Sequence, residues 1–143
     1  RVVINGTCLD FLAESFMAGD PLDGGGFVVL NGIELDDHGR VIPQAAPYPG
    51  SNLFSLASGC AIYIRDPHRQ VVEDQLNGGT FTSLTLEDWL LIHPFLEENE
   101  RLFGVSVEQL LTVDGKLRRP EEVYRKVSAV KLKVLAAETG GTE

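Results

Sequence analysis

The chain has 143 residues, a formal net charge of −9 and 43% hydrophobic residues, which indicates one domain with an apolar core. The acidic balance excludes a typical nucleic-acid-binding protein, because phosphate groups require a basic surface. No apolar run is long enough to cross a bilayer and no basic-then-apolar leader opens the sequence, so we expect a cytoplasmic protein with no membrane partner. Cys8 and Cys60 form no C-x-x-C pair, so the sequence predicts neither a disulfide framework nor a metal knuckle.

The first part of the chain alternates short apolar runs with turn-forming residues. We expect strands at 1–5, Phe27–Leu30 and Cys60–Arg65, because each is apolar or β-branched and each ends at a turn signal. Between them we expect a loop at Asp20–Gly26, a hairpin-like excursion at Ile33–Ile42 and an extended connector at Gln44–Tyr48. Shorter strands are expected at Val71–Val72 and Phe81–Leu84.

From Thr85 the hydrophobic period changes from that of a strand to that of a helix. Thr85 is a helix N-cap with Asp88 at the third position, as in a capping box, and the pattern predicts that Pro94 kinks or restarts this helix. Short helices are expected after Ser106 and at Pro120. The predicted inner face of the long helix consists of Leu86, Trp89, Leu90, His93 and Leu96.

The end of the chain is more basic than the rest. From Lys116 onward seven Lys/Arg stand against four acids, a balance of +3, which leaves −12 for the first 115 residues. We expect this segment to dock on the acidic body or on a partner protein. Within it, Ser128–Leu135 alternates apolar residues with Lys131 and Lys133, which predicts a half-exposed strand.

Candidate functional residues have structural interpretations that fit the sequence better. The glycines of Asp20–Gly26 resemble a phosphate cradle, but a strand follows instead of a helix, so a plain loop is favoured. Asp36, Asp37 and His38 are adjacent and point in different directions, which favours a tight turn over a metal site.

The other reactive side chains belong to no recognisable catalytic motif in the sequence. His68 lies in a turn, His93 lies on an apolar helix face, and Cys60 has no neighbouring His or Asn, so it is expected to be a small buried residue. We therefore expect no catalytic, cofactor-binding or metal-binding residue in this chain.

Two segments of the chain resemble each other. Each opens on a glycine (Gly6, Gly50), passes a second glycine (Gly19, Gly59) and closes on a strand-like run (27–30, 61–64). Such units bury their apolar faces by stacking on further copies. The first segment reads Gly6-Thr7…Asp10-Phe11-Leu12-Ala13-Glu14…Met17-Ala18-Gly19…Phe27-Val28-Val29-Leu30-Asn31-Gly32. The second reads Gly50-Ser51-Asn52…Ser58-Gly59-Cys60-Ala61-Ile62-Tyr63-Ile64-Arg65. Together they resemble the last two coils of the GXGXG domain family.

This resemblance implies a mainly β fold. The expected architecture is a right-handed parallel β-helix whose terminal coils span 1–84, followed at 85–143 by a small helical cap and a basic tail with a final strand. The two parts would form one structural domain, with further coils expected before Arg1. The chain departs from the family where apolar residues replace corner glycines, which implies that those corners are covered by protein. The replacing residues are Leu9, Ala13, Leu53, Phe54 and Leu56.

The family occurs at the end of the large subunit of glutamate synthase, as a separate chain in split archaeal-type glutamate synthases, and in one of the subunits of formylmethanofuran dehydrogenase. The resemblance implies a non-catalytic scaffold that braces a glutaminase module and a flavin and iron–sulfur module. FMN and iron–sulfur clusters would then reside in the partner modules, with no cofactor in this chain. The alternatives are a scaffold of a formylmethanofuran dehydrogenase-like complex and a small-ligand-binding protein that uses the Asp20–Gly26 loop. A homo-oligomer through an open coil end is also compatible with the resemblance.

Overall fold

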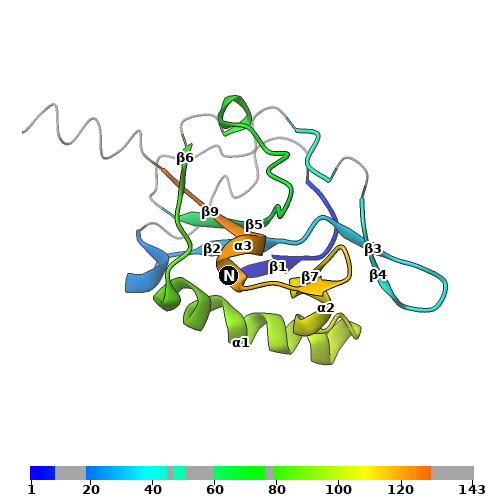
Figure 1. The fold of residues 1–143 in the computed structure, drawn as a ribbon. Coiled ribbons are helices and arrows are strands. Elements are labelled where there is room, and N and C mark those ends of the chain that lie inside the picture. Colours follow the sequence, from blue (N-terminus) through cyan, green and yellow to red (C-terminus); the bar gives the residue numbers. More distant parts are fainter. Residues whose placement is uncertain (9–18, 45–46, 51–59, 77–78, 130–143) are drawn as a thin grey trace, which may run out of the picture.

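The centre of the fold is a five-stranded mixed sheet in the order β1-β2-β5-β9-β6 (Figure 1). The computed structural model describes residues 1–8, 19–44, 47–50, 60–76 and 79–129. Strands β1, β2 and β5 run parallel, whereas β9 is antiparallel to both β5 and β6. The sheet strands are β1 (Val2–Ile4), β2 (Phe27–Leu30), β5 (Ala61–Arg65), β6 (Gly79–Thr82) and β9 (Tyr124–Ala129).

The two inner parallel strands are apolar because both of their faces are covered. Every residue of β2 and β5 is buried, and a strand enclosed on both faces has a continuous apolar run in place of alternation. The strands pair in register from Phe27 opposite Ala61 to Leu30 opposite Ile64.

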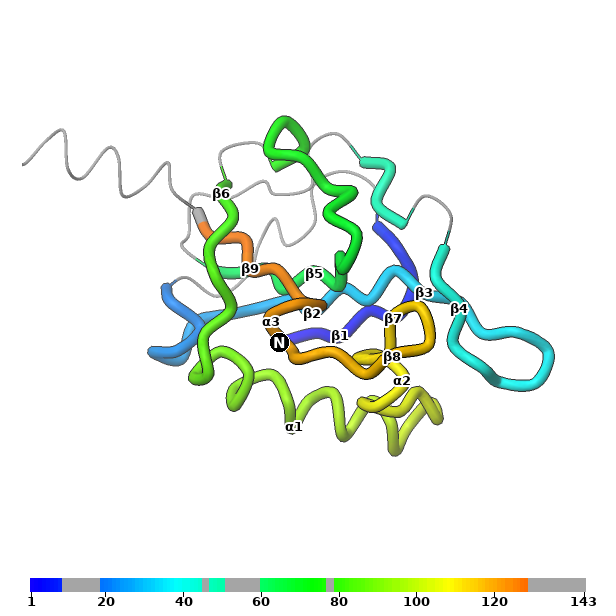
Figure 2. Tube along the Cα trace, in the orientation of Figure 1, coloured from blue at the N-terminus to red at the C-terminus, as the bar shows by residue number. Residues whose placement is uncertain are grey.

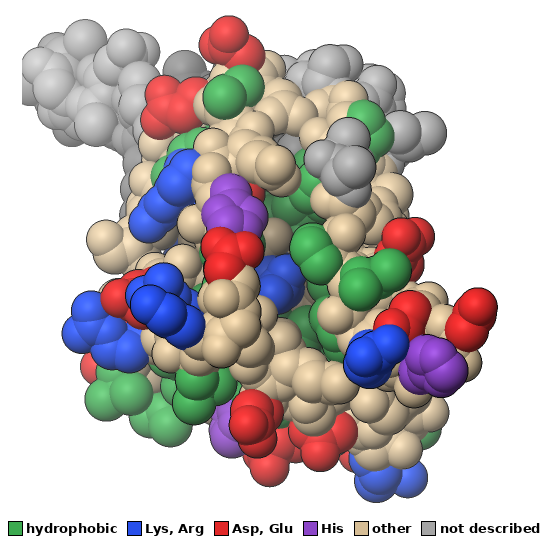
Figure 3. All heavy atoms as spheres, turned by 45° about the vertical axis from the view of Figure 1, so that its right-hand side comes forward, with side chains coloured by type: hydrophobic (Ala, Val, Ile, Leu, Met, Phe, Trp, Pro, Cys, Tyr) green, Lys and Arg blue, Asp and Glu red, His purple; other side chains and the backbone are tan. Residues whose placement is uncertain are grey.

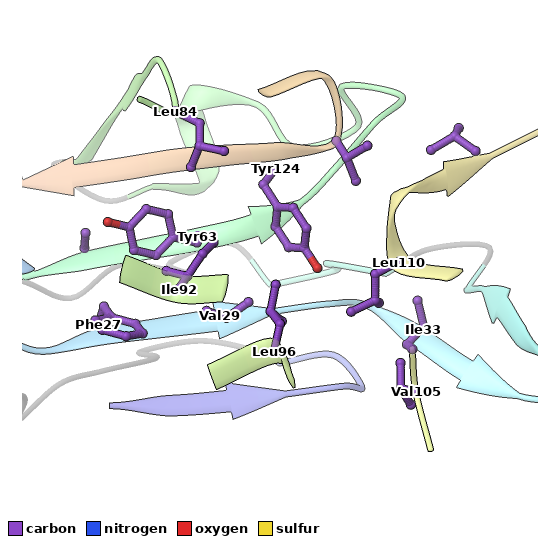
Figure 4. Packing of buried hydrophobic residues seen from close by; sticks show 13 residues of the cluster. Phe27, Val29, Ile33, Tyr63, Leu84, Ile92, Leu96, Val105, Leu110 and Tyr124 are labelled. Carbon is purple, nitrogen blue, oxygen red and sulfur yellow. The ribbon is translucent and has the colours of Figure 1, made fainter. Parts of the chain in front are cut away.

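Helix α1 (Leu86–Phe103) covers one face of this sheet. Thr85 caps it, since its hydroxyl accepts from the Asp88 amide and Asp88 accepts from the Thr85 amide, which satisfies two otherwise unpaired donors. Phe27, Val29 and Tyr63 point from the sheet toward this side (Figure 4). They pack there with Ile92 and Leu96 of α1.

The opposite face is covered by loop segments. Val28, Leu30, Ile62 and Ile64 point to this side and pack with Tyr48, Cys60, Val71, Leu76 and Val127. A short 3₁₀ turn, η2 (Glu73–Gln75), lies in the segment before β6. Alternate side chains of β2 and β5 thus serve two separate apolar clusters.

The remaining elements lie around the ends of the sheet. A hairpin of β3 (Ile33–Leu35) and β4 (Val41–Pro43) projects from the end of β2. After α1 the chain passes through helix α2 (Val107–Leu111) and the hairpin of β7 (Thr112–Val113) and β8 (Lys116–Leu117), then returns through α3 (Pro120–Val123) to β9 (Figure 2). A 3₁₀ turn, η1 (Pro21–Asp23), precedes β2.

Three asparagines, of which Asn31 and Asn99 are buried, join the carboxyl ends of β1 and β2 to α1 and β9. Asn31 donates to Asn5 at 2.9 Å, and Asn5 and Asn99 exchange amide hydrogen bonds at 2.9 Å. The Tyr124 hydroxyl donates to the Asn31 side-chain oxygen at 2.7 Å. These bonds satisfy the almost completely enclosed side chains of Asn31 and Asn99, as buried amides require.

The structure overturns the expected fold class. The described residues form a small mixed α/β domain with sheets of five, two and two strands and no solenoid sheet, so the predicted right-handed parallel β-helix is wrong. The strands that close the two similar segments do lie side by side in parallel. However, antiparallel β9 follows β5 in the sheet, and α1 covers a face on which a β-helix needs a further sheet.

Several local predictions are confirmed. Strands occur at 2–4, 27–30 and 61–65, the Ile33–Ile42 excursion is a hairpin, and helices follow Thr85, Ser106 and Arg119. The openings of the two similar segments at 9–18 and 51–59, with Leu9, Ala13, Leu53, Phe54 and Leu56, lie outside the described residues. So does most of the predicted strand Ser128–Leu135.

Other local predictions are wrong. Leu86 and Leu90 are 68% and 62% exposed, whereas Asp88, Ile92, Leu96 and Asn99 form the inner face of α1. The helix does not restart at Pro94, which lies on its exposed side. Val71 and Val72 form no strand, and the final described strand begins at Tyr124.

Gly32 occupies a position that no other residue fits well. Its φ is +60°, and a Cβ there would lie 2.6 Å from the Tyr48 hydroxyl. That hydroxyl lies 2.8 Å from the Arg65 carbonyl oxygen and 3.0 Å from that of Leu30. A substitution at Gly32 therefore strains the backbone and displaces a buried hydroxyl that joins two strands.

We expect Gly32→Ala to lower the free energy of unfolding by about 2 kcal/mol or more, since conformational strain and steric conflict add. Gly104→Ala is the matched control, because Gly104 has φ of +74° and open space around its Cβ position. Its cost of about 1 kcal/mol isolates the conformational term. Urea unfolding measures both, and equal losses would contradict the steric contribution.

Candidate functional site

A pocket opens at the carboxyl end of the parallel strands, with a volume of about 1020 Å³. It lies between the β3–β4 hairpin, the loop that follows β5, and the segment from Gly104 to Gly115. Figure 3 shows a hollow with basic side-chain atoms inside and histidine and acidic side chains beside it. Parallel strands end together, and this edge of an α/β sheet is where ligands commonly bind.

Arg65 is the basic residue that β5 delivers to this pocket. It ends the strand opposite Tyr124 of β9 and is 7% exposed. Its Nε donates to the Leu110 carbonyl at 2.8 Å and its Nη2 donates to the Thr112 carbonyl at 3.3 Å. The side chain therefore fixes α2 and β7 against the sheet while it lines the pocket.

The neighbouring carboxylate of Asp66 is occupied by structural interactions. It accepts from the Gln70 amide at 2.8 Å, from the Val71 amide at 3.0 Å and from Arg125 Nη1 at 2.9 Å. Its side chain is 2% exposed, and such a carboxylate needs these partners. Asp66 thus closes the turn after β5 and holds β9.

His68 lies beside the same pocket. Its Nε2 is 3.8 Å from an Asp114 carboxylate oxygen, and both side chains are more than half exposed. An exposed pair of this kind contributes little to stability. It brings together the β5 turn and the β7–β8 turn at the pocket rim.

A second polar cluster lies between α1 and the sheet. Asp88 accepts from the Tyr63 hydroxyl at 2.7 Å, from Lys126 Nζ at 2.9 Å and from the Thr85 hydroxyl at 2.8 Å. Burial alone raises the pKa of Asp88, but the bonds from Lys126, Tyr63 and Thr85 outweigh it and lower the pKa. Burial and the Asp88 carboxylate raise the pKa of Tyr63.

This cluster is suited to structure more than to chemistry. Asp88 is completely enclosed, and it has no place among the residues that line the pocket. Sequence reasoning identified Asp88 only as part of a capping box and missed its bonds to β5 and β9. The basic pair Arg125–Lys126 was the available signal, because the basic segment was expected to dock on the acidic body or on a partner protein. For these two residues the ion pairs with Asp66 and Asp88 show docking on the body.

Three amides of the glycine-rich loop Asp20–Gly26 are bonded within the loop itself. The Leu22 amide donates to the Asp20 side chain, and the Asp23 and Gly25 amides donate to the Asp20 carbonyl. The predicted plain loop agrees with these bonds, since an anion cradle requires unpaired amides.

The Asp36–His38 turn is similarly self-contained. The Asp36 carboxylate accepts from the amides of His38 and Arg40 and from Arg40 Nε. Backbone bonding from Arg40 is the main reason that the pKa of Asp36 is lowered. Within the described part of the chain, no three His, Cys, Asp or Glu side chains form a group able to hold a metal ion.

The remaining candidates are separated in space. His93 lies against Trp89, with ring centroids 5.1 Å apart, and its Nδ1 is 3.5 Å from Glu97. Cys60 is buried in the cluster opposite α1, and Cys8 packs against that cluster. The structure brings only His68, among the expected candidates, to the pocket. Arg65 was not among the candidates from sequence. The only signal for it was a charged residue at the end of an apolar strand.

Comparison with known proteins yields no relative. No family model, curated protein or solved structure matches the chain. The resemblance of its two similar segments to the GXGXG domain therefore stays a prediction from sequence. In the described residues, no helix has the length and apolar character that a membrane span requires.

Lys126→Met removes the cation that faces Asp88. Its side chain is 12% exposed, and loss of one partner leaves a buried carboxylate without a counter-charge, so we expect the free energy of unfolding to fall by about 3 kcal/mol. Lys116→Met is the matched control at an exposed position, with a change of no more than about 0.5 kcal/mol. Equal changes in urea unfolding would contradict a structural role for the pair.

Asp88 also predicts a pH dependence of stability. Its pKa is lower in the folded state than the ordinary 3.8, so its ionised form stabilises the fold above about pH 5, and this contribution is lost as the pH falls through the folded pKa. The difference in unfolding free energy between wild type and Asp88→Asn should narrow as the pH falls from about 5 to about 3. A difference that stays constant over this range would contradict the assignment.

Proposed function

We propose that this chain is a non-catalytic structural module of a cytoplasmic, glutamate-synthase-like amidotransferase. In this role it braces a glutaminase module and a flavin and iron–sulfur module, which carry the cofactors. The observation that carries the proposal is the parallel, in-register pairing of β2 with β5. These strands close the two segments that resemble neighbouring units of one structural family.

The use of the buried ionisable groups supports a structural role. Asp88 joins α1 to Lys126 of β9, and Asp66 joins the turn after β5 to Arg125. Both pairs connect segments far apart in sequence and lie away from solvent. Groups held in this way fix a scaffold, because breaking either pair leaves an uncompensated charge.

The edge of the sheet at β1 offers a place for a neighbouring chain. Among the described strands β1 pairs only with β2, and the Ile4 carbonyl accepts from Asn31 on that side. Since successive residues of a strand direct their backbone groups to opposite sides, the N–H and C=O of Val3 face outward. An edge of this kind accepts a strand of another subunit.

Purification of the natural assembly through a tag on this chain tests the proposal. We expect co-purified subunits that contain flavin and iron–sulfur clusters and that, with an added two-electron reductant, convert one glutamine and one 2-oxoglutarate to two glutamates. Val3→Pro should reduce recovery of the assembly at least tenfold, because it removes an outward N–H. Val3→Ala, which loses the same packing and keeps the N–H, should retain recovery within about twofold.

Other outcomes separate the alternatives. An assembly with formylmethanofuran dehydrogenase activity would assign the scaffold to that complex instead. A chain recovered alone, as a monodisperse monomer from the natural source, would contradict the structural role. Equal recovery of the two Val3 variants would contradict β1 as the contact edge while leaving the assembly itself established.

A further inference from the structure

Arg65 carries a charge that the described fold does not neutralise. It is 7% exposed, and no ion pair within the described residues includes it. The nearest acidic neighbour in sequence, Asp66, is paired with Arg125 at 2.9 Å. A charge held out of water without a counter-charge is costly, so the site favours an anion.

The guanidinium of Arg65 retains hydrogen-bond donors for such an anion. Of its five N–H groups, one on Nε and one on Nη2 donate to the carbonyls of Leu110 and Thr112. These two bonds occupy one side of the fork and leave the end formed by Nη1 and Nη2. Arg125 Nε is the one enclosed side-chain nitrogen or oxygen without a hydrogen-bond partner among the described residues. The Arg65 donors that make no hydrogen bond are therefore not enclosed, and they open to the pocket that Arg65 lines.

The position of this fork is fixed before any ligand arrives. Arg65 pairs with Tyr124 across the sheet, its carbonyl accepts from Tyr48, and its side chain is tied to α2 and β7. Binding therefore does not require ordering of a long flexible side chain, which otherwise lowers affinity.

The walls of the pocket distinguish between classes of anion. Glu108, Asp114 and Arg40 also line it, and the charge of Arg40 is balanced by its ion pair with Asp36. The charges of Glu108 and Asp114 disfavour a dianionic phosphate more than a singly charged carboxylate. Val41, Pro43 and Val113 supply apolar surface for an organic body. Two parallel N–H groups match the two oxygens of a carboxylate.

We propose that this pocket binds a small organic monocarboxylate, whose carboxylate group is held by the free end of the Arg65 guanidinium. The proposed structural role does not require this binding site, and the site does not depend on that role.

Titration of the ¹⁵N-labelled chain with sodium benzoate tests the site, with inorganic phosphate and sodium chloride as parallel probes. We expect saturable amide shifts confined to 40–44, 65–70 and 104–115, and benzoate binding at least fivefold tighter than phosphate. Chloride should produce no saturable shift there. Absence of a saturable shift with benzoate would overturn the proposal, and equal binding of benzoate and phosphate would overturn the carboxylate assignment.

Variants of Arg65 complete the test. Arg65→Lys keeps the charge and loses the planar fork, so benzoate affinity should fall about tenfold. Arg65→Gln should abolish benzoate binding if this variant remains folded. If it unfolds, the result for Arg65→Lys tests the role of Arg65. Arg118→Gln, at an exposed position outside the pocket, is the control and should bind benzoate within about twofold of wild type. Unchanged benzoate affinity in Arg65→Lys would overturn the assignment to Arg65.

Discussion

The buried carboxylate of Asp88 constrains most of this structure. A completely enclosed ionised group must have all its partners in place, because the loss of even one leaves charge without compensation. Its partners come from the helix cap, from β5 through Tyr63 and from β9 through Lys126. One side chain therefore sets the start of α1, its rotation, and its position relative to two strands. This explains why α1 turns Asp88 inward and leaves Leu86 and Leu90 exposed.

Local structure was largely predictable and topology was not. Strands, turns and caps follow from residues close together in sequence, as at Phe27–Leu30 and Thr85. The apolar runs of β2 and β5, however, fit any fold that buries both faces of a parallel strand, whether a coil of a solenoid or a sheet covered by a helix. The last strand was predicted at Ser128–Leu135, later in the chain than β9, since Arg125 and Lys126 interrupt the apolar pattern of β9. Their carboxylate partners lie 59 and 38 residues away.

The pocket was hidden from sequence for the same reason. Its lining comes from the β3–β4 hairpin, the turn after β5 and the α2–β7 segment, and no short spacing records that these meet. The two ligand-like motifs are a different case, because the sequence already favoured a loop and a turn at these positions. The Asp20–Gly26 loop and the Asp36–His38 turn have ligand-like composition, but their carboxylates and carbonyls bind their own amides. Such residues are common in turns because they satisfy the local backbone.

The distribution of buried charge connects the scaffold to the pocket. Asp66 neutralises Arg125 and fastens β9 to the turn after β5, and Asp88 neutralises Lys126 and fastens β9 to α1. Arg65 lies one residue before Asp66, yet the turn directs Asp66 to β9 and the strand directs Arg65 to the carbonyls of α2 and β7. The enclosed carboxylate at this edge, that of Asp66, is thus occupied in holding the turn and β9. Its one enclosed arginine among the described residues is held by neutral carbonyls, which orient the guanidinium without cancelling its charge, and an orienting contact of that kind is what an anion-binding group requires.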